Sequence, residues 1–319
     1  MTRTLPGGAL ERLSRSVELD VWAGPGAPSY DELRRRTAGV EGLLCLLSDR
    51  VDAQLLDGCP SLRVVSSCSV GLDHVDLVAA ARLGLPVGHT PGVLAETTAD
   101  LGFALLLAAA RRIAEADRFV RRGDWAREQG WDPELLLGRD VHGATLGIVG
   151  LGAIGRAVAR RAAGFGMRVL GWSRSGRHVE GVESVDLTKL LADSDFVSVH
   201  VARTSETTGL IDARALELVR PGAILVNTAR GGIVDEDALA NALRAGRLAG
   251  AALDVYATEP LPPTSPLLEL DNVVLTPHIG SSSLATRSRM ADLAVDNLLA
   301  GLEGRPLPHA APVPSSTST

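Results

Sequence analysis

One segment near the middle of the chain, Thr145–Arg156 (TLGIVGLGAIGR), constrains the fold more than any other. It combines an apolar run typical of a buried strand, glycines at three spaced positions, and a helix expected over Ala153–Phe165. In such a strand–turn–helix unit, Gly150 permits a tight turn, Gly152 lets the backbone approach a pyrophosphate, and Gly155 lets the helix pack closely on the strand. The helix N-terminus also favours negative charge. The segment therefore predicts a dinucleotide-binding site, against the plainer alternative of a tight β–α turn.

Strands and helices are expected to alternate on both sides of this turn. The larger, later part has the number of strands found in a doubly wound parallel sheet, so we expect an α/β fold there. The earlier part alternates too, which predicts a second, smaller α/β unit. The expected strands are Leu146–Gly150, Met167–Trp172, Phe196–Val201, Ala223–Asn227, Gly250–Val255 and Asn272–Thr276 in the larger unit, and Val17–Trp22, Gly42–Leu47, Arg63–Ser67 and Pro86–Gly88 in the smaller one.

The domain organisation follows from two helices. A long apolar helix over Leu94–Arg112 is expected to leave the first unit and enter the second. An amphipathic helix over Leu284–Ala300 lies beyond the sixth strand and is expected to return to the first unit. A chain of 319 residues usually forms two domains. We therefore expect a discontinuous substrate-binding domain (1–98 and 287–319), a dinucleotide-binding domain (99–286), and a disordered tail, PVPSSTST.

Composition narrows the classes of partner and location. A net charge of −6 argues against nucleic acid or an anionic membrane as the main partner. The longest apolar run, Phe103–Ala110, is too short to span a bilayer, and the first residues lack the apolar region of a signal peptide. Cys45, Cys59 and Cys68 have neither metal-site spacing nor an even number, which favours a reducing cytoplasm and no metal.

Several catalytic mechanisms are excluded by residue usage. Lys189 is the only lysine, so a catalytic lysine is nearly excluded. Neither Tyr30 nor Tyr256 is followed four residues later by lysine, so the Tyr-x-x-x-Lys pair of short-chain dehydrogenases is absent. No histidine or cysteine cluster has the spacing of zinc ligands.

The second predicted strand of the larger unit indicates which dinucleotide is bound. NAD-specific folds place an acidic residue about 20 positions after the glycines, where it binds the ribose 2′-hydroxyl. Here no acidic residue occurs between Gly155 and Glu180, and the strand runs into Ser173, Arg174 and Ser175. A guanidinium can bind a 2′-phosphate through charge-assisted hydrogen bonds, and Arg177 is nearby. NADP(H) is therefore preferred and NAD(H) possible, unless these are only solvated surface arginines.

Three residues that follow the last expected strands suggest a reaction. Arg230, Glu259 and His278 each come at or just after a strand end, where open α/β sheets bind ligands. His278 could give a proton to a ketone that receives a hydride. Glu259 would stabilise the charged imidazole, and Arg230 would bind the oxygens of a 2-keto acid. Each residue taken alone could be structural.

At these positions the chain resembles the D-isomer-specific 2-hydroxyacid dehydrogenases, from about Gly42 to Pro306. The resemblance implies a discontinuous, flavodoxin-like substrate domain, Arg230 as substrate anchor, His278 as acid/base and Glu259 as its partner. It also implies cofactor contacts near the nicotinamide, among them Asp254. The motifs that carry it are LGIVGLGAIG, VNTARGGIVDEDAL, GAALDVYATEPLP and NVVLTPHIGS. Together with the residues of the glycine turn and of the second strand's end, the full set of expected cofactor-binding residues is Thr98, Gly150, Gly152, Ala153, Ile154, Gly155, Ser173, Arg174, Ser175, Thr228, Ala229, Asp254 and Gly280.

Within the family the chain is most similar to glyoxylate/hydroxypyruvate reductases, through SCSVGLDHVDL, HTPGVLAETTADL and GWDPELLLGRDVHGATLG. This resemblance implies NADPH-dependent reduction of glyoxylate and hydroxypyruvate to glycolate and D-glycerate by a homodimer. Ser69 and the backbone N–H groups of Val70 and Gly71 would hold the substrate carboxylate. Trp131 would line a neighbouring subunit's pocket, or else only pack in the dimer. Arg203 departs from the family's usual leucine and could touch the adenosine.

Two alternatives stay open at this stage. A D-lactate or broad-specificity 2-keto acid reductase of the same family has the same site residues, because pocket width cannot be read from one sequence. A nucleotide-sensing corepressor or scaffold could share the fold and keep the cofactor site without a physiological reaction. Longer phosphoglycerate dehydrogenases, and formate dehydrogenases with glutamine at the position of Glu259, fit less well.

Overall fold

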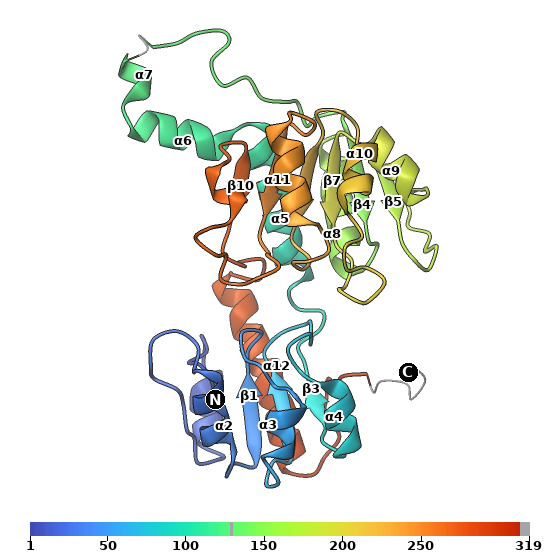
Figure 1. The fold of residues 1–319 in the computed structure, drawn as a ribbon. Helices are drawn as coiled ribbons and strands as arrows, with labels where there is room; N and C mark the ends of the chain where they lie inside the picture. The colour runs from blue at the N-terminus through green and yellow to red at the C-terminus, as the bar shows by residue number, and fades with distance from the viewer. Residues whose placement is uncertain (128–129, 313–319) are drawn as a thin grey trace. The chain divides into compact units, whose positions relative to one another are not determined.

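The structure, a computed structural model, describes residues 1–127 and 130–312 (Figure 1). Most of the tail expected to be disordered lies outside the described residues. The chain divides into two compact units. Unit 1 is built from Met1–Leu94 and Ser281–Thr319, and unit 2 from Ala95–Gly280. These boundaries lie a few residues from those expected.

Unit 2 is built around a seven-stranded, wholly parallel sheet in the order β10-β9-β8-β7-β4-β5-β6. The order changes direction at β4, which lies between β5 and β7, so the expected doubly wound α/β fold is confirmed. All six strands expected from the sequence are present, and β6 adds a short edge strand. The bounds are β4 Thr145–Val149, β5 Arg168–Trp172, β6 Glu183–Ser184, β7 Phe196–Val199, β8 Ile224–Asn227, β9 Gly250–Leu253 and β10 Val273–Leu275.

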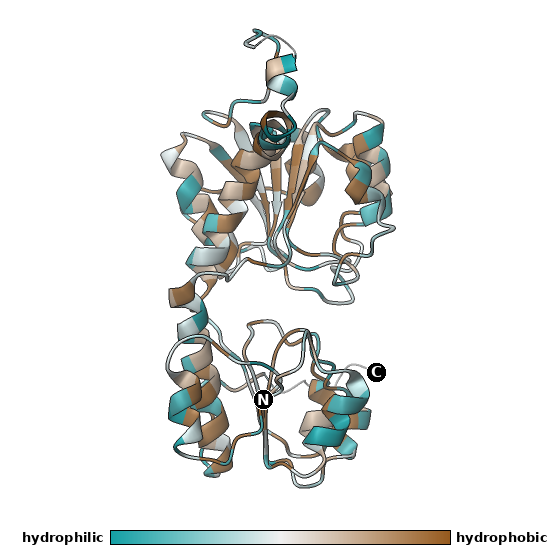
Figure 2. Ribbon diagram, turned by 90° about the vertical axis from the view of Figure 1, so that its left-hand side faces the viewer, coloured by the Kyte–Doolittle hydropathy of each residue, from teal (hydrophilic) through white to brown (hydrophobic). Residues whose placement is uncertain are grey.

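Helices cover both faces of this sheet, and each face has its own apolar core (Figures 1 and 2). One core joins the strands to α9, α10 and α11, and the other joins them to α5 and α8. Asp186, Asp212 and Asp235 begin α9, α10 and α11 as N-caps, each accepting a backbone N–H of the first turn. The bounds are α5 Ala95–Ala110, α6 Ile113–Arg121, α7 Asp124–Arg127, α8 Ala153–Gly164, α9 Leu187–Asp193, α10 Ala213–Leu218, α11 Glu236–Arg244 and a 3₁₀ helix, η1, Pro266–Glu269.

The long helix expected over Leu94–Arg112 is shorter in the structure. It ends at Ala110, whose carbonyl accepts the N–H of Arg139 at 2.8 Å instead of continuing the helical ladder. Arg112 then adopts a left-handed conformation with φ of 52°, and α6 begins at the next residue. No residue of α6 or α7 is buried. No helix among the described residues has the length and apolarity needed to cross a bilayer.

Unit 1 has a smaller parallel sheet of three strands in the order β1-β2-β3. Helix α12 packs on β1 and β2, where a Cβ on Gly301 would lie 2.5 Å from the side chain of Val64. Ser66 of β2 also donates a hydrogen bond to the carbonyl of Ala294 in α12 at 2.7 Å. The bounds are β1 Gly42–Cys45, β2 Val64–Ser67, β3 Val87–Gly88, α1 Ala9–Ser14, α2 Tyr30–Thr37, α3 Ala53–Asp57, α4 Leu77–Arg82 and α12 Leu284–Leu302.

The strand expected over Val17–Trp22 is wrong, because this segment is not part of the sheet. Its alternation of apolar and polar residues indicates packing: Val17 and Leu19 contact the core formed with α1 and α12. A strand also needs a neighbouring backbone to pair with. Here the backbone N–H of Trp22 donates to the carbonyl of Met1 at 3.0 Å and that of Val17 donates to the carbonyl of Leu13 at 3.1 Å, and neither bond joins the segment to the sheet.

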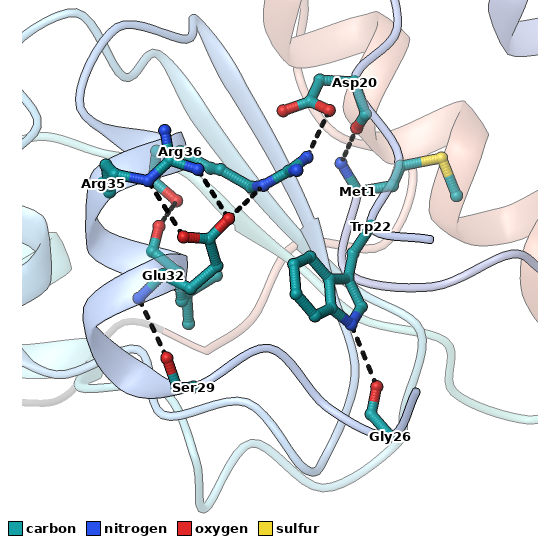
Figure 3. Close-up of polar contacts among 10 residues, drawn as sticks. Met1, Asp20, Trp22, Gly26, Ser29, Glu32, Arg35 and Arg36 are labelled. Carbon is teal, nitrogen blue, oxygen red and sulfur yellow. Dashed lines mark hydrogen bonds and ion pairs between the residues drawn. The ribbon is translucent and has the colours of Figure 1, made fainter. Parts of the chain in front are cut away.

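Side chains hold this segment in place of a strand ladder (Figure 3). The indole N–H of Trp22 donates to the carbonyl of Gly26 at 3.1 Å, and the guanidinium of Arg36 lies 5.2 Å from the centre of the indole ring. The N-terminal amine of Met1 donates to the carbonyl of Asp20 at 2.6 Å. The segment is therefore fixed by local contacts at the surface of unit 1.

Candidate functional site

The glycine turn after β4 has a geometry that only glycine allows at two of its three positions. Gly150 has φ of 108°, and a Cβ there would lie 2.7 Å from the carbonyl carbon of His200. A Cβ on Gly155 would lie 2.0 Å from the carbonyl oxygen of Gly150. By contrast, a Cβ on Gly152 would meet no atom within 4 Å. Gly152 therefore borders open space at the start of α8, while the other two glycines are required by the packing.

The residues of this turn fit the pyrophosphate of a dinucleotide. Gly152 is the N-cap of α8 and makes no side-chain cap, so the first N–H groups of the helix are available to an anion. Ala153 and Ile154 are the first two residues of α8, and neither is buried. An uncapped helix start beside open space is the arrangement by which such folds bind phosphate groups.

His278 and Glu259 form the closest polar contact among the predicted catalytic residues. The imidazole Nδ1 of His278 lies 2.7 Å from Oε2 of Glu259. Oε1 of the same carboxylate accepts the backbone N–H of Tyr256 at 3.0 Å. Burial opposes ionisation of Glu259, but the hydrogen bonds from His278 and Tyr256 and the charges of His278 and Arg230 outweigh it and lower its pKa. The carboxylate is therefore held in its charged form beside the imidazole.

Asp254 fixes the turn that carries His278. Its Oδ1 accepts the N–H of Ile279 at 2.8 Å and the hydroxyl of Thr276 at 2.6 Å. Its Oδ2 accepts the N–H of Gly280 at 2.8 Å. Burial raises the pKa of Asp254 against these stabilising bonds. The turn on either side of His278 is thus tied to the end of β9.

Arg230 lies in the loop after β8, which packs directly against the loop after β9. Asn227, the last residue of β8, shapes this loop: its side chain donates to the carbonyl of Arg230 at 3.0 Å and accepts the N–H of Ala229 at 3.0 Å. A Cβ on Gly231 would lie 1.8 Å from the carbonyl oxygen of Tyr256. Arg230, Glu259 and His278 therefore come from three successive loops at the carboxyl edge of the sheet.

Thr98 lies on α5 at the same edge, close to Asp254 and Gly280. A Cβ on Gly280 would lie 3.3 Å both from Cγ2 of Thr98 and from Oδ2 of Asp254. Thr228, at the end of β8, directs its hydroxyl to within 3.6 Å of the position of a Cβ on Gly102 of α5. The structure thus brings together several of the residues predicted to surround the nicotinamide.

His200, which follows β7, was not among the site residues predicted from the sequence. Its Nε2 lies 2.8 Å from the hydroxyl of Ser198, and its Nδ1 is buried with no partner among the described residues. Burial lowers the pKa of His200 to about 4, so the imidazole is neutral near pH 7. The sequence did carry a signal for this residue, because His200 is polar and lies at the carboxyl end of the expected strand Phe196–Val201.

The turn after β5 carries the residues predicted to select the cofactor. Ser173 accepts the N–H of Arg177 at 3.0 Å, which closes the turn around Arg174 and Ser175. The guanidinium of Arg174 forms an ion pair with Glu206. Arg203, the residue that departs from the family pattern, lies in the loop after β7. Its guanidinium is 4.0 Å from the position that a Cβ on Gly232 would take, and Gly232 lies in the loop after β8.

The predicted carboxylate-binding residues lie in unit 1, in the loop after β2. The hydroxyl of Ser69 donates to the carbonyl of Gly71 at 2.7 Å and contacts the hydroxyl of Ser67 at 2.7 Å. The carbonyl of Val70 lies 3.0 Å from Nδ1 of His89. The loop is thus internally braced, and the Ser69 hydroxyl is used within it.

Trp131 lies in unit 2, in the segment after α7, and 81% of it is exposed. Three other large apolar side chains nearby in the sequence, Ile113, Val120 and Trp125, are also about half exposed. The arm that contains them, residues 113–127 and 130–137 and hereafter called the arm, therefore presents apolar surface. This exposure is compatible with both predicted roles of Trp131.

A family model for the NAD-binding domain of D-isomer specific 2-hydroxyacid dehydrogenases matches residues 103–280. The chain belongs to this family. The resemblance inferred from its motifs is thereby confirmed, and the chain is an NAD(P)-dependent oxidoreductase of the D-2-hydroxyacid dehydrogenase type.

Relatives of this dehydrogenase match over nearly its whole length. A protein named glyoxylate reductase from Korarchaeum cryptofilum is 49% identical over 313 residues, which cover 97% of this chain and 94% of that protein. A glyoxylate reductase from Thermococcus litoralis is 45% identical over 314 residues, covering 97% and 95% of the two chains.

Solved structures agree with this assignment. The TT0316 protein from Thermus thermophilus superposes with a TM-score of 0.92 at 51% identity, covering 98% of each chain. An NADPH-dependent glyoxylate/hydroxypyruvate reductase from Sinorhizobium meliloti, in complex with NADP and malonate, has a TM-score of 0.84 at 34% identity and covers 97% of this chain and 94% of its own.

Proposed function

We propose that this dehydrogenase reduces glyoxylate and hydroxypyruvate to glycolate and D-glycerate with NADPH. The observation that carries the proposal is the 2.7 Å contact between His278 and Glu259, on the same sheet edge of unit 2 as the glycine turn. The names of the two curated relatives, both glyoxylate reductases, support the choice of substrate.

The pair provides the proton that the reaction needs. A reduced nicotinamide cofactor held at the glycine turn would supply the hydride, with both of its electrons, for the carbonyl carbon. The protonated imidazole of His278 gives its proton to the carbonyl oxygen, which becomes the hydroxyl of the product. Glu259 stabilises the imidazolium through Nδ1, so that Nε2 is the donor to the substrate. The balance is one hydride and one proton added to a ketone or aldehyde.

Arg230 is proposed to orient the substrate by binding its carboxylate and carbonyl oxygens. The loop after β8 is suited to this role because Asn227 and the packing of Gly231 against Tyr256 fix its backbone. Val70 and Gly71 of unit 1 are proposed to bind the carboxylate through their N–H groups. Their contribution is tested separately, by the KM of Gly71 variants.

The preference for NADPH is supported by the turn after β5. It presents Ser173, Arg174 and Ser175 and no carboxylate of its own. An arginine with neighbouring hydroxyls can hold a 2′-phosphate, while an acidic residue would repel it. The Sinorhizobium relative, 34% identical, is described as NADPH-dependent.

The exposed arm supports the further proposal of a homodimer. Ile113, Val120, Trp125 and Trp131 present large apolar side chains, which favours burial against another copy. Light scattering coupled to size exclusion should give twice the mass of 33.3 kDa.

We also propose a cytoplasmic location, because the three cysteines are free and buried, as expected in a reducing compartment.

The decisive experiment is a set of steady-state kinetics. The purified enzyme is given glyoxylate, hydroxypyruvate or pyruvate, each with NADPH or NADH, and the loss of cofactor absorbance is followed. We expect the highest kcat/KM for glyoxylate or hydroxypyruvate with NADPH. Preference for pyruvate would instead indicate a D-lactate or broad 2-keto acid reductase. No turnover with bound cofactor would indicate a nucleotide sensor.

A further inference from the structure

The ion pair between Arg174 and Glu206 joins two loops across the cofactor edge of unit 2. Arg174 follows β5, and Glu206 lies in the loop between β7 and α10. In the sheet, β5 and β7 are the two neighbours of β4. The pair therefore connects the loops that flank the end of β4, where the glycine turn at Gly150 begins. Open sheets of this kind bind the cofactor at that position, where the strand order reverses.

Hydrogen bonds within the loop that carries Glu206 fix the loop's backbone, and this keeps Glu206 within reach of Arg174. The buried Thr207 donates from its hydroxyl to the carbonyl of Ala202 at 2.7 Å and accepts the N–H of Thr204 at 2.8 Å. The hydroxyl of Thr208 donates to the carbonyl of Thr204 at 2.8 Å. The ion pair can therefore open by rotation of either exposed side chain, without movement of this loop.

A carboxylate at this position affects the two nicotinamide cofactors differently. The 2′-phosphate of NADPH needs the Arg174 guanidinium, which Glu206 already binds, and the two anionic groups repel each other. The 2′-hydroxyl of NADH is neutral and does not need the guanidinium. Both side chains are well exposed, so the pair is weak enough to open.

We propose that Glu206 is a specificity-determining residue that competes with the 2′-phosphate for Arg174 and so limits the preference for NADPH over NADH. The inference deepens the proposed function, since it rests on Arg174 as the phosphate-binding residue. It assigns to the loop after β7 a role in cofactor choice that the glycine turn and the loop after β5 do not fill.

The test is the variant Glu206→Gln, which keeps the size of the side chain and removes its charge. Dissociation constants for NADPH and NADH are measured by quenching or enhancement of fluorescence, without any keto acid. We expect NADPH to bind about two- to fivefold more tightly at low ionic strength, with NADH unchanged. The gain should shrink as salt is added, because exposed charges are screened.

Glu183→Gln is the matched control. Glu183 forms the same kind of exposed ion pair with an arginine of β5, Arg168, at 2.7 Å, but at the amino end of that strand. The Glu183→Gln variant changes the net charge by the same amount as Glu206→Gln. We expect its effect on the dissociation constant of either cofactor to be smaller than the effect of Glu206→Gln on the dissociation constant of NADPH. Equal effects of the two variants, or an unchanged ratio of the two constants in Glu206→Gln, would overturn the inference.

The outcome is separable from the proposed function. Wild-type enzyme that binds NADPH and NADH but leaves glyoxylate unreduced would refute the proposed reaction, while the ratio of dissociation constants would still test Glu206. If Arg174→Gln left the affinity for NADPH unchanged, the phosphate site itself would be wrong, and the role of Glu206 would fall with it.

Discussion

Asp254 accepts the backbone N–H of Ile279 at 2.8 Å, and this bond anchors the residue that directly follows His278. His278 has φ of 53°, a left-handed conformation that residues with a side chain seldom adopt. The bond therefore helps to hold a strained backbone in the conformation that directs the imidazole toward Glu259. We therefore propose that Asp254 positions the proposed catalytic pair, in addition to its predicted place near the nicotinamide.

We expect Asp254→Asn to lower both stability and kcat. The amide NH₂ replaces one of the two carboxylate oxygens, and so leaves the backbone N–H of Ile279 or of Gly280 without its acceptor. This costs about 1–3 kcal/mol in the free energy of unfolding. Chemical denaturation and steady-state kinetics measure the two effects. Thr276→Val removes only one of the bonds and should cost less; equal stability of Asp254→Asn and the wild type would contradict the assignment.

His278→Ala should lower kcat by about 10²–10⁴-fold, the usual contribution of a general acid. The affinity for NADPH should stay near that of the wild type, because the glycines proposed to bind its phosphates lie on another loop. Single-turnover kinetics and a fluorescence titration separate the two effects. A variant that kept near-full turnover would remove His278 from the mechanism.

The pH dependence of the reaction should report the carboxylate of Glu259. Its pKa is lowered in the folded protein, so its stabilisation of the imidazolium is present above that pKa and is lost as the pH falls through it. We therefore divide the kcat/KM of the wild type by that of Glu259→Gln at each pH. This ratio should stay high until the pH is below the ordinary pKa of a glutamate, and should then fall. A ratio that already falls near neutral pH would show that another group controls the pair.

His200 should make the enzyme less stable in mild acid. Its pKa is about 4 in the folded state and 6.5 in the unfolded state, so the unfolded chain takes up a proton first as the pH falls. The free energy of unfolding should decrease between those two values, by on the order of 3 kcal/mol. His200→Gln can still bond to Ser198 but does not titrate, so urea unfolding of this variant should show a smaller decrease. An identical decrease in both proteins would place the cause elsewhere.

The glycines of the turn after β4 should respond differently to alanine. Gly155→Ala forces a methyl group into the carbonyl oxygen of Gly150 and should lower the thermal midpoint. Gly152→Ala meets no protein atom, so it should leave the midpoint unchanged and weaken NADPH binding. Thermal scans with and without cofactor measure both. Unchanged NADPH affinity in Gly152→Ala would mean that the cofactor does not approach this residue.

The sequence was most informative where a structural element is defined by neighbouring residues. The strand before Gly150 and the helix after it follow from an apolar run and spaced glycines, and both are present. The short edge strand Glu183–Ser184 has no apolar run and was not expected. The alternation over Val17–Trp22 indicated burial correctly but not pairing, because a pattern along one segment carries no information about a neighbouring backbone.

The same limit applies to the site. Arg230, Glu259 and His278 could be singled out because each follows an expected strand. The contacts of Asp254 with Ile279 and Gly280 join residues far apart in the sequence, and the pair of Arg174 with Glu206 joins two separate loops. Neither has a local signature, so only the fold reveals that Asp254 braces the His278 turn and that Glu206 faces Arg174.

The division of the chain has a consequence for biosynthesis. Unit 2 is continuous, Ala95–Gly280, and both of its cores can form as soon as that stretch has left the ribosome. The strands β1 and β2 of unit 1 precede unit 2 in the chain, but they pack on α12, which follows unit 2 and is synthesised after it. The sheet of unit 1 is therefore completed only after the whole of unit 2 has been made, and its strands lack their α12 contacts until then.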